Sequence, residues 1–324
     1  MAGRRRKKSG GRSYAWRYRG RIVACVFVEV IIICALVIMI GWNKGVKEWF
    51  EQFEQPVLKE VDISGINSPN AILMQARGGK ILGEINGEAQ IYPASMTKIM
   101  TVILGIENFD DLDEKITLTN EMFTGLYEQD ATQAGFQPGE EVRVIDLLYG
   151  AMLPSGAECC IALADTISGS EADFAELMNK KAAKLGMENT NFCDSTGLHN
   201  PDHYSTVKDI AVLMKYCIKN DTFREIVETS RHSTGVTNIH PDGITYYSTM
   251  FKNLSDPTVT GGKILGGKTG YTSEAGHCLV SFAEIEGREY IFVSAGASGA
   301  DGNTIPHIQD AVTVYNRVGA AIEA

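Results

Sequence analysis

The chain has few cysteines, and their spacing builds neither a disulfide framework nor a zinc site. Seven cysteines are spread over 324 residues. Two fall in an apolar N-terminal run, which leaves an odd number at irregular intervals: positions 159, 160, 193, 217 and 278. This excludes the small disulfide-rich class of secreted domains. Cys159 and Cys160 fall in a predicted helix and are interpreted as small core residues. We therefore expect no metal and no cofactor.

Basic side chains are scarce over most of the sequence. There are 30 Lys and Arg against 40 Asp and Glu. Nine of the basic residues lie in the first 42 positions beside one acid, Glu29, so the remainder holds 21 basic and 39 acidic side chains, a net charge of −18. Nucleic-acid binding requires a basic face, so this acidic body argues against a nucleic-acid partner. There is also no internal repeat and no low-complexity linker.

One long hydrophobic run stands near the N-terminus. Residues 22–40 are nineteen almost uninterrupted apolar positions, followed by Trp42. The run is long enough to cross a bilayer, whereas a signal-peptide core needs only about 7–15 residues. The nine preceding basic residues predict a cytoplasmic N-terminus. We therefore expect a basic cytoplasmic tail at 1–21 and a transmembrane signal anchor at 22–42, with the rest of the chain outside. Glu29 is interpreted as a tolerated charge near the inner leaflet.

Residues 43–66 are expected to form a membrane-proximal stalk. Apolar residues at positions 46, 49, 50 and 53 recur at helical spacing before Pro56, which predicts a short amphipathic helix. The pattern fits equally well a helix on the membrane surface and one packed on the following domain.

Residues 67–324 show the pattern of one globular domain. Two strand-like segments separated by Gly78-Gly79 predict a β-hairpin over 71–85. Helices are predicted from Ser95 onward and over 142–153, 157–166, 171–185, 206–219 and 305–322, and strands over 263–272, 277–284 and 289–295. This order predicts an α+β fold in which one antiparallel sheet brings the first and last segments together.

The string Ser95-Met96-Thr97-Lys98 opens a predicted buried helix and carries residue types suited to acyl transfer. A serine hydroxyl is a weak nucleophile until a neighbouring group removes its proton. Ser95 and Lys98 lie three positions apart, hence on one helical face and within reach of each other. The Ser95 backbone N–H, at the helix N-terminus, can donate to a developing oxyanion.

A second S-x-x-K string begins at Ser205. So short a pattern also arises by chance, so a match alone does not identify a nucleophile. It opens a predicted helix after His203-Tyr204, so Ser205 or Thr206 is better interpreted as an N-cap. His199 and His203 are not expected to bind a metal, since Pro201 breaks the helix that an i,i+4 pair requires.

Two further strings are Ser155-Gly156-Ala157 and Lys268-Thr269-Gly270. The latter lies in a glycine-rich strand, where the small residues allow another backbone to approach the sheet edge. An extended peptide could add there as a strand. Its terminal carboxylate would then meet the Lys268 amine and the Thr269 hydroxyl.

An S-x-x-K, an S-x-N-like triad and a K-T-G, in that order, form the motif set of serine penicillin-recognising enzymes. Four stretches extend the match: YPASMTKIMT, LLYGAMLPSGAECCIALAD, FAELMNKKAAKLGMENTNFCDSTGLHNPDHYSTVKDIA and GGKTGYTSEAGHCLV. Together they resemble the D-alanyl-D-alanine carboxypeptidase family of low-molecular-mass penicillin-binding proteins. The resemblance runs through roughly residues 67–300. It implies a β-lactamase/transpeptidase-like domain, an antiparallel sheet flanked by helices, held at the bacterial cell membrane on the extracytoplasmic side.

The resemblance also implies roles for individual residues. Ser95 resembles the acyl-enzyme nucleophile, Lys98 its proton acceptor, and Ser155 the serine that relays a proton to the leaving amine. Four residues are implied to bind substrate, with the N–H groups of Ser95 and Tyr271 forming the oxyanion hole: Lys268, Thr269, Gly270 and Tyr271. Ala157 departs from the family pattern, in which an Asn orients the base lysine and the substrate amide.

The implied function is a serine-type D-Ala-D-Ala carboxypeptidase that trims terminal D-Ala from peptidoglycan stem peptides. β-Lactam antibiotics are the implied inhibitors, and residues 22–42 would provide the membrane contact. Three alternatives stay open: a β-lactamase, a DD-endopeptidase using the same residues, and a penicillin- or peptidoglycan-binding pseudoenzyme, the last because of Ala157. No deacylating glutamate is recognisable, which disfavours the β-lactamase. The sequence does not indicate an oligomeric state.

Overall fold

The structure, a computed structural model, describes residues 58–299 and 305–323. The expected tail, membrane span and amphipathic helix lie outside these residues. Within the described ranges no helix is both long and apolar enough to cross a bilayer. The packed unit begins at Leu58, earlier than the expected boundary at 67. The reason is that Leu58, Val61 and Ile63 are buried in one of the two cores, so this part of the expected stalk belongs to the domain.

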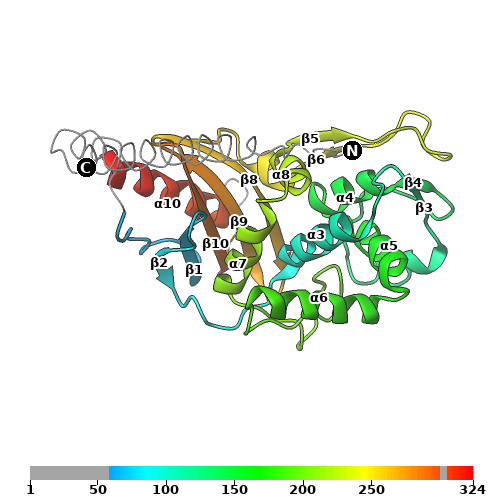
Figure 1. Cartoon of the computed structure of the whole chain (residues 1–324), viewed down its shortest axis with the longest axis horizontal. Coiled ribbons are helices and arrows are strands. Elements are labelled where there is room, and N and C mark those ends of the chain that lie inside the picture. The colour runs from blue at the N-terminus through cyan, green and yellow to red at the C-terminus, as the bar shows by residue number, and fades with distance from the viewer. Residues whose placement is uncertain (1–57, 300–304, 324) are drawn as a thin grey trace, which may run out of the picture. The chain divides into compact units, whose positions relative to one another are not determined.

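A six-stranded antiparallel sheet forms the centre of the fold, in the order β2-β1-β10-β9-β8-β7 (Figure 1). Its strands are β1 (Asn70–Gln75), β2 (Ile81–Ile85), β7 (Thr258–Val259), β8 (Gly262–Thr272), β9 (Gly276–Ile285) and β10 (Arg288–Ala297). β1 pairs with β10, with Asn70 opposite Ala295. The first hairpin and the last strands therefore share one sheet, which confirms the predicted topology.

The helices and two small sheets complete the described chain. The helices are η1 (Ala94–Thr97), α3 (Lys98–Asn108), η2 (Asn120–Phe123), α4 (Val144–Met152), α5 (Ala157–Ser168), α6 (Glu171–Leu185), α7 (Val207–Cys217), α8 (Asp221–Glu228), α9 (Thr249–Asn253) and α10 (Pro306–Glu323). Two-stranded sheets pair β3 (Lys115–Thr117) with β4 (Glu141–Arg143) and β5 (Arg231–Ser233) with β6 (Thr245–Tyr247). The predicted helices and strands are confirmed within a few residues. The short elements α8, α9 and β3 to β7 were not predicted.

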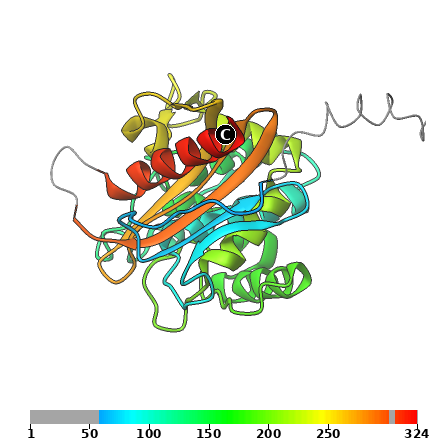
Figure 2. The ribbon, with the colours of Figure 1, turned by 90° about the vertical axis from the view of Figure 1, so that its left-hand side faces the viewer.

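The sheet separates two hydrophobic cores because successive strand residues point to opposite faces. On β1, Ala71 and Leu73 belong to the core under α10, whereas Ile72 and Met74 belong to the core shared with the helical region. Figure 2 shows α10 lying across one face of the sheet. α3 runs through the larger core, and all its residues from Lys98 to Gly105 are buried. A lysine at the start of such a helix is thereby held away from bulk water.

Candidate active site

The site lies where β8 crosses η1, the short helix that leads into α3. At Gly270, a Cβ atom would lie 2.9 Å from the Ser95 backbone nitrogen and 3.1 Å from the Ala94 Cβ. Only glycine therefore lets the third string run this close to the first. Ala94 itself has φ +46°, a left-handed conformation that alanine rarely adopts. Backbone strain of this kind is held in place by the surrounding packing and is common at functional sites.

Ser95 and Lys98 are in direct contact. The Lys98 amine lies 3.0 Å from the Ser95 hydroxyl oxygen and donates to the Thr196 carbonyl at 2.7 Å. Lys98 is 3% exposed, whereas Ser95 is partly open to solvent. The geometry suits proton transfer from a hydroxyl that a substrate can still reach.

Ser155 and Lys268 form a second serine–lysine contact. The Lys268 amine lies 3.0 Å from the Ser155 hydroxyl oxygen and 2.8 Å from the Thr269 carbonyl. Burial, helped by the nearby charge of Lys98, holds the pKa of Lys268 well below its usual value. Ser155 has φ +73°, so this string too contains a strained non-glycine residue. Because its pKa is lowered, the buried Lys268 gives up its proton more readily than an exposed lysine would.

One edge of β8 is open beside these residues. β7 pairs only with the beginning of the strand, opposite Gly262 and Lys263. No other described strand pairs with that edge, so the backbone of its far part, up to Thr272, has no strand partner on that side among the described residues. Thr269 is half-buried and bonded through its hydroxyl to that of Thr249 at 2.7 Å, while Tyr271 is 60% exposed. The structure thus brings all seven predicted site residues to one place.

Several residues at the site were not predicted. Thr249 lies at the start of α9, a helix too short to be recognised. Asp194, Thr196 and His203 come from the loop between α6 and α7, whose residues meet the S-x-x-K segment from far along the chain. The contact of His203 with Thr97 has no signal in the sequence. The described residues include no cluster of three or more His, Cys, Asp or Glu that could hold a metal.

The second S-x-x-K string is structural, as predicted. The Thr206 hydroxyl caps α7 by accepting from the Asp209 N–H at 3.0 Å. Ser205 is fully buried, and its hydroxyl lies 2.8 Å from that of Thr190. The amine of Lys208 pairs with Glu88 on the surface, so it is not held against Ser205.

Glu158 does not replace the missing Asn. Its Oε1 accepts from the N–H groups of Ala134 and Gly135 at 2.6 and 2.9 Å, so the carboxylate is held by that loop. Burial raises the pKa of this carboxyl group. Cys159 and Cys160, next along the helix, are fully buried core residues, as predicted. Ala157 itself is buried and presents only a methyl group, so it offers no amide to Lys98 or to a substrate.

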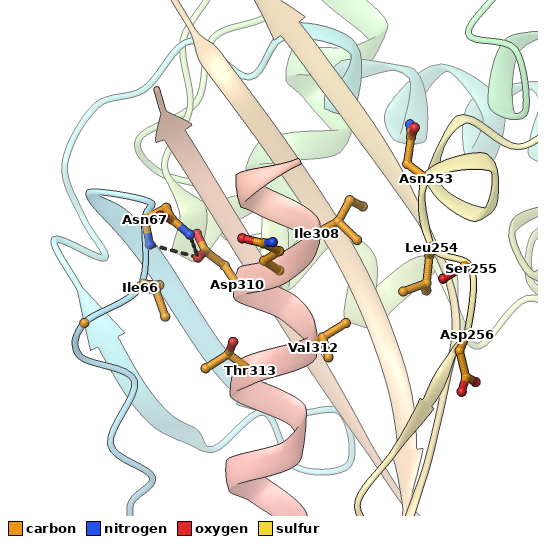
Figure 3. A pocket seen from close by; sticks show the side chains of 12 residues that line it. Ile66, Asn67, Asn253, Leu254, Ser255, Asp256, Ile308, Asp310, Val312 and Thr313 are labelled. Carbon is orange, nitrogen blue, oxygen red and sulfur yellow. Dashed lines mark hydrogen bonds between the residues drawn. The ribbon is translucent and has the colours of Figure 1, made fainter. Parts of the chain in front are cut away.

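Two cavities are relevant to the position of the site. One of about 470 Å³ borders it and is lined by residues that include Thr196, Leu198 and Glu171. The other, of about 510 Å³, lies between α10 and the turn after α9 (Figure 3). In it, Asp310 accepts from Asn67 and Ser68, and no residue of the three strings lines it. The first cavity is not lined by these strings either, but it meets the site through Thr196, whose carbonyl accepts from Lys98.

The sheet, the buried helix and the paired serines and lysines define the class of serine penicillin-recognising folds. A family profile described as D-alanyl-D-alanine carboxypeptidase matches residues 57–299. The chain belongs to this family.

Named relatives agree with this assignment. The D-alanyl-D-alanine carboxypeptidase DacF of Bacillus subtilis is 35% identical over 71% of this chain and 57% of its own length. DacC of Escherichia coli is 33% identical over 73% of this chain and 58% of its own length. The chain therefore spans less than two thirds of these relatives. The carboxypeptidase of Streptomyces sp. K15 is 34% identical over 70% of this chain and 78% of its own length.

Solved structures show the same fold. The crystal structure of the Streptomyces K15 DD-transpeptidase superposes with a TM-score of 0.70 at 29% identity, covering 80% of this chain and all of that one. A D-alanyl-D-alanine carboxypeptidase of Mycobacterium tuberculosis also reaches a TM-score of 0.70, over 81% of this chain and 94% of its own. At 22% identity, the second match shows the fold alone.

Proposed function

We propose that this protein is a serine-type D-Ala-D-Ala carboxypeptidase that removes the terminal D-Ala of peptidoglycan stem peptides through an acyl-enzyme on Ser95. The observation that carries the proposal is the pair of serine–lysine contacts, each 3.0 Å long, beside the open edge of β8. One pair supplies an activated nucleophile and the other a proton path to the leaving group. Family membership adds support.

Substrate binding is proposed to follow the edge of β8. An extended stem peptide pairs with the strand, and its terminal carboxylate lies against the Lys268 amine and the Thr269 hydroxyl. The penultimate D-Ala carbonyl then lies near Ser95, because the strand passes very close to it at Gly270. A Cβ atom added at Gly270 would lie only 2.9 Å from the Ser95 nitrogen. The N–H groups of Ser95 and Tyr271 would receive its oxygen.

The reaction is proposed to proceed in two steps. Lys98 takes the proton of the Ser95 hydroxyl as the oxygen attacks the carbonyl carbon. The proton taken by Lys98 is then relayed through the Ser155 hydroxyl, which Lys268 contacts, to the D-Ala amine as the C–N bond breaks. Ser155 regains a proton as it gives one up, and free D-Ala leaves. Water then attacks the ester, releases the shortened peptide and restores the Ser95 hydroxyl.

The membrane anchor belongs to the proposal. Residues 22–42 would hold the protein in the bacterial cell membrane as a single-pass signal anchor, with the catalytic domain outside the cytoplasm. The support is the nineteen-residue apolar run after nine basic side chains. Such a placement brings the site to peptidoglycan, and β-lactams would then act as inhibitors.

The test is release of D-Ala from diacetyl-Lys-D-Ala-D-Ala, run in parallel with labelling by a fluorescent penicillin. A carboxypeptidase releases D-Ala and holds the penicillin label for many minutes. Rapid hydrolysis of the penicillin would indicate the β-lactamase. Neither label nor D-Ala release would indicate the pseudoenzyme that Ala157 leaves open.

A further inference from the structure

A buried histidine–aspartate pair contacts the nucleophile segment from behind. His203 is 2% exposed, and its Nε2 lies 2.9 Å from the Thr97 hydroxyl oxygen. Its Nδ1 lies 3.1 Å from a carboxylate oxygen of Asp194 and 3.2 Å from the Cys193 nitrogen. Thr97 is the residue between Ser95 and Lys98 that faces this pair. The ring therefore links the carboxylate to the S-x-x-K segment.

Asp194 also holds the turn that carries the carbonyl partner of Lys98. Its Oδ1 accepts from the Thr196 N–H, the Thr196 hydroxyl and the Gly197 N–H, each at 2.7 Å. Burial alone would raise the pKa of Asp194, but hydrogen bonds from His203 and Thr196 bring it to about 2. The carboxylate is thus ionised at neutral pH and strongly bonded.

The turn meets the first string at two points. The Thr196 carbonyl accepts from the Lys98 amine at 2.7 Å. Gly197 has φ +79°, and a Cβ there would lie only 1.9 Å from the Ala94 carbonyl oxygen. Asp194 therefore acts on Lys98 through Thr196, and on the segment next to Ser95 through Gly197 and His203.

We propose that Asp194 and His203 are positioning residues that fix the orientation of the Lys98 amine toward Ser95. The Thr196 carbonyl accepts one N–H of the Lys98 amine and so limits rotation of the amine. The rest of the amine is then directed toward the Ser95 hydroxyl. In the usual family pattern an Asn at the second string orients this lysine, and here that position is Ala157. The inference rests on the proposed function, in which Lys98 is the proton acceptor.

The experiment compares the rate of acylation by a fluorescent penicillin in wild type, Asp194→Ala and Asp194→Asn. Asp194→Ala removes the acceptor of the three bonds from Thr196 and Gly197 and the partner of His203. Acylation should slow by roughly 10- to 100-fold, as for a displaced catalytic group. Asp194→Asn keeps one acceptor oxygen and should recover most of the lost rate. With the D-Ala-D-Ala peptide, the loss should appear in kcat, with KM changed by less than about threefold.

The chain offers a matched control. Glu140 is fully buried, its Oε1 lies 2.7 Å from Nδ1 of His240, and its Oε2 accepts from the Gln137 N–H at 2.9 Å. None of its partners belongs to the site. Glu140→Ala should lower the melting temperature as Asp194→Ala does, yet leave acylation within about threefold of wild type at a temperature where both are folded.

A second variant keeps the test decisive if Asp194→Ala does not fold. Thr97→Val removes the hydroxyl that contacts His203 while keeping the shape of the side chain, and acylation should again slow, by at least about fivefold. Folded Asp194→Ala that acylates as fast as Glu140→Ala would overturn the proposal, as would unchanged acylation in Thr97→Val. If wild type itself is never labelled and releases no D-Ala, the proposed function fails instead.

Discussion

Ser95 and Ser205 each begin an S-x-x-K string, but their surroundings differ. Ser95 is partly open to solvent and touches the buried amine of Lys98 at 3.0 Å. Ser205 is buried with its hydroxyl against that of Thr190, and Lys208 extends to Glu88 on the surface. A nucleophile needs both access and a base, and only the first string provides them.

This difference predicts the outcome of lysine substitutions. Lys98→Ala should reduce penicillin labelling by at least about 1,000-fold, because a serine and its base act as one unit. Lys208→Ala is the matched control and should label at the wild-type rate, since it removes only an exposed ion pair. Labelling followed on a gel over time distinguishes the two, and equal rates would refute the role of Lys98.

Ala157 allows a prediction at the second string. Residue 157 is the first residue of α5, and its N–H donates outside the helix, to the Thr132 carbonyl at 2.8 Å. We expect Ala157→Asn to keep or raise release of D-Ala, because the family geometry has room for the amide. A folded variant without activity would show that the backbone at Ser155 differs from that of the family.

At the scale of elements, the crossing of β8 over η1 makes Gly270 sensitive to a single methyl group. Gly270→Ala would push the Ser95 nitrogen or the strand away, since the new Cβ would lie 2.9 Å from that nitrogen. Acylation should fall by roughly 10- to 100-fold. Gly235→Ala is the control, because its Cβ would meet only Arg143 at ordinary distances of 3.4 Å or more. Unchanged acylation in folded Gly270→Ala would contradict this geometry.

The first turn of α10 contains a buried histidine that predicts acid sensitivity. Burial, and then the neighbouring ring of His277, lower the pKa of His307 from 6.5 to about 4. The unfolded chain therefore takes up a proton before the folded one, so stability is present above pH 6.5 and is lost as the pH falls toward 4. The loss from this residue is roughly 3 kcal/mol at most.

Denaturant titrations at pH 7 and pH 4.5 measure this effect. His307→Gln cannot titrate, so its free energy of unfolding should fall less between the two pH values than that of wild type. An equal fall in both proteins would mean that His307 does not contribute. Each protein is compared with itself at the two pH values, so any pH-independent change that the substitution makes to the free energy of unfolding cancels.

At the scale of the whole molecule, periodic segments could be predicted and contacts between distant loops could not. The hairpin, the long helices and the last three strands carry clear period-2 or period-3.6 patterns. α8, α9 and the two-stranded sheets are too short to show a period. The pairing of Asp194 and His203 with Thr97 depends on a loop folding back onto α3, which no local pattern records. The three strings were recognised because their residue types and order are constrained by chemistry.

The topology of the whole chain gives a further prediction. Protease added to intact cells should degrade the chain beyond about residue 43 and spare an epitope placed within 1–20, because nine basic residues precede the apolar run. Immunoblotting of both ends, with lysed cells as the control, measures this. Protection of the C-terminal domain in intact cells would overturn the orientation.

The most direct test of the account is the mass of the protein after incubation with penicillin, followed by mapping of the modified peptide. The account predicts one added penicilloyl group, carried by the peptide that contains Ser95, and no adduct in Ser95→Ala. Because no carboxylate of residues 58–299 and 305–323 is hydrogen-bonded to the Ser95 hydroxyl to activate water, the adduct should persist for many minutes after free drug is removed. An adduct on another residue, or one that survives Ser95→Ala, would contradict the central claim.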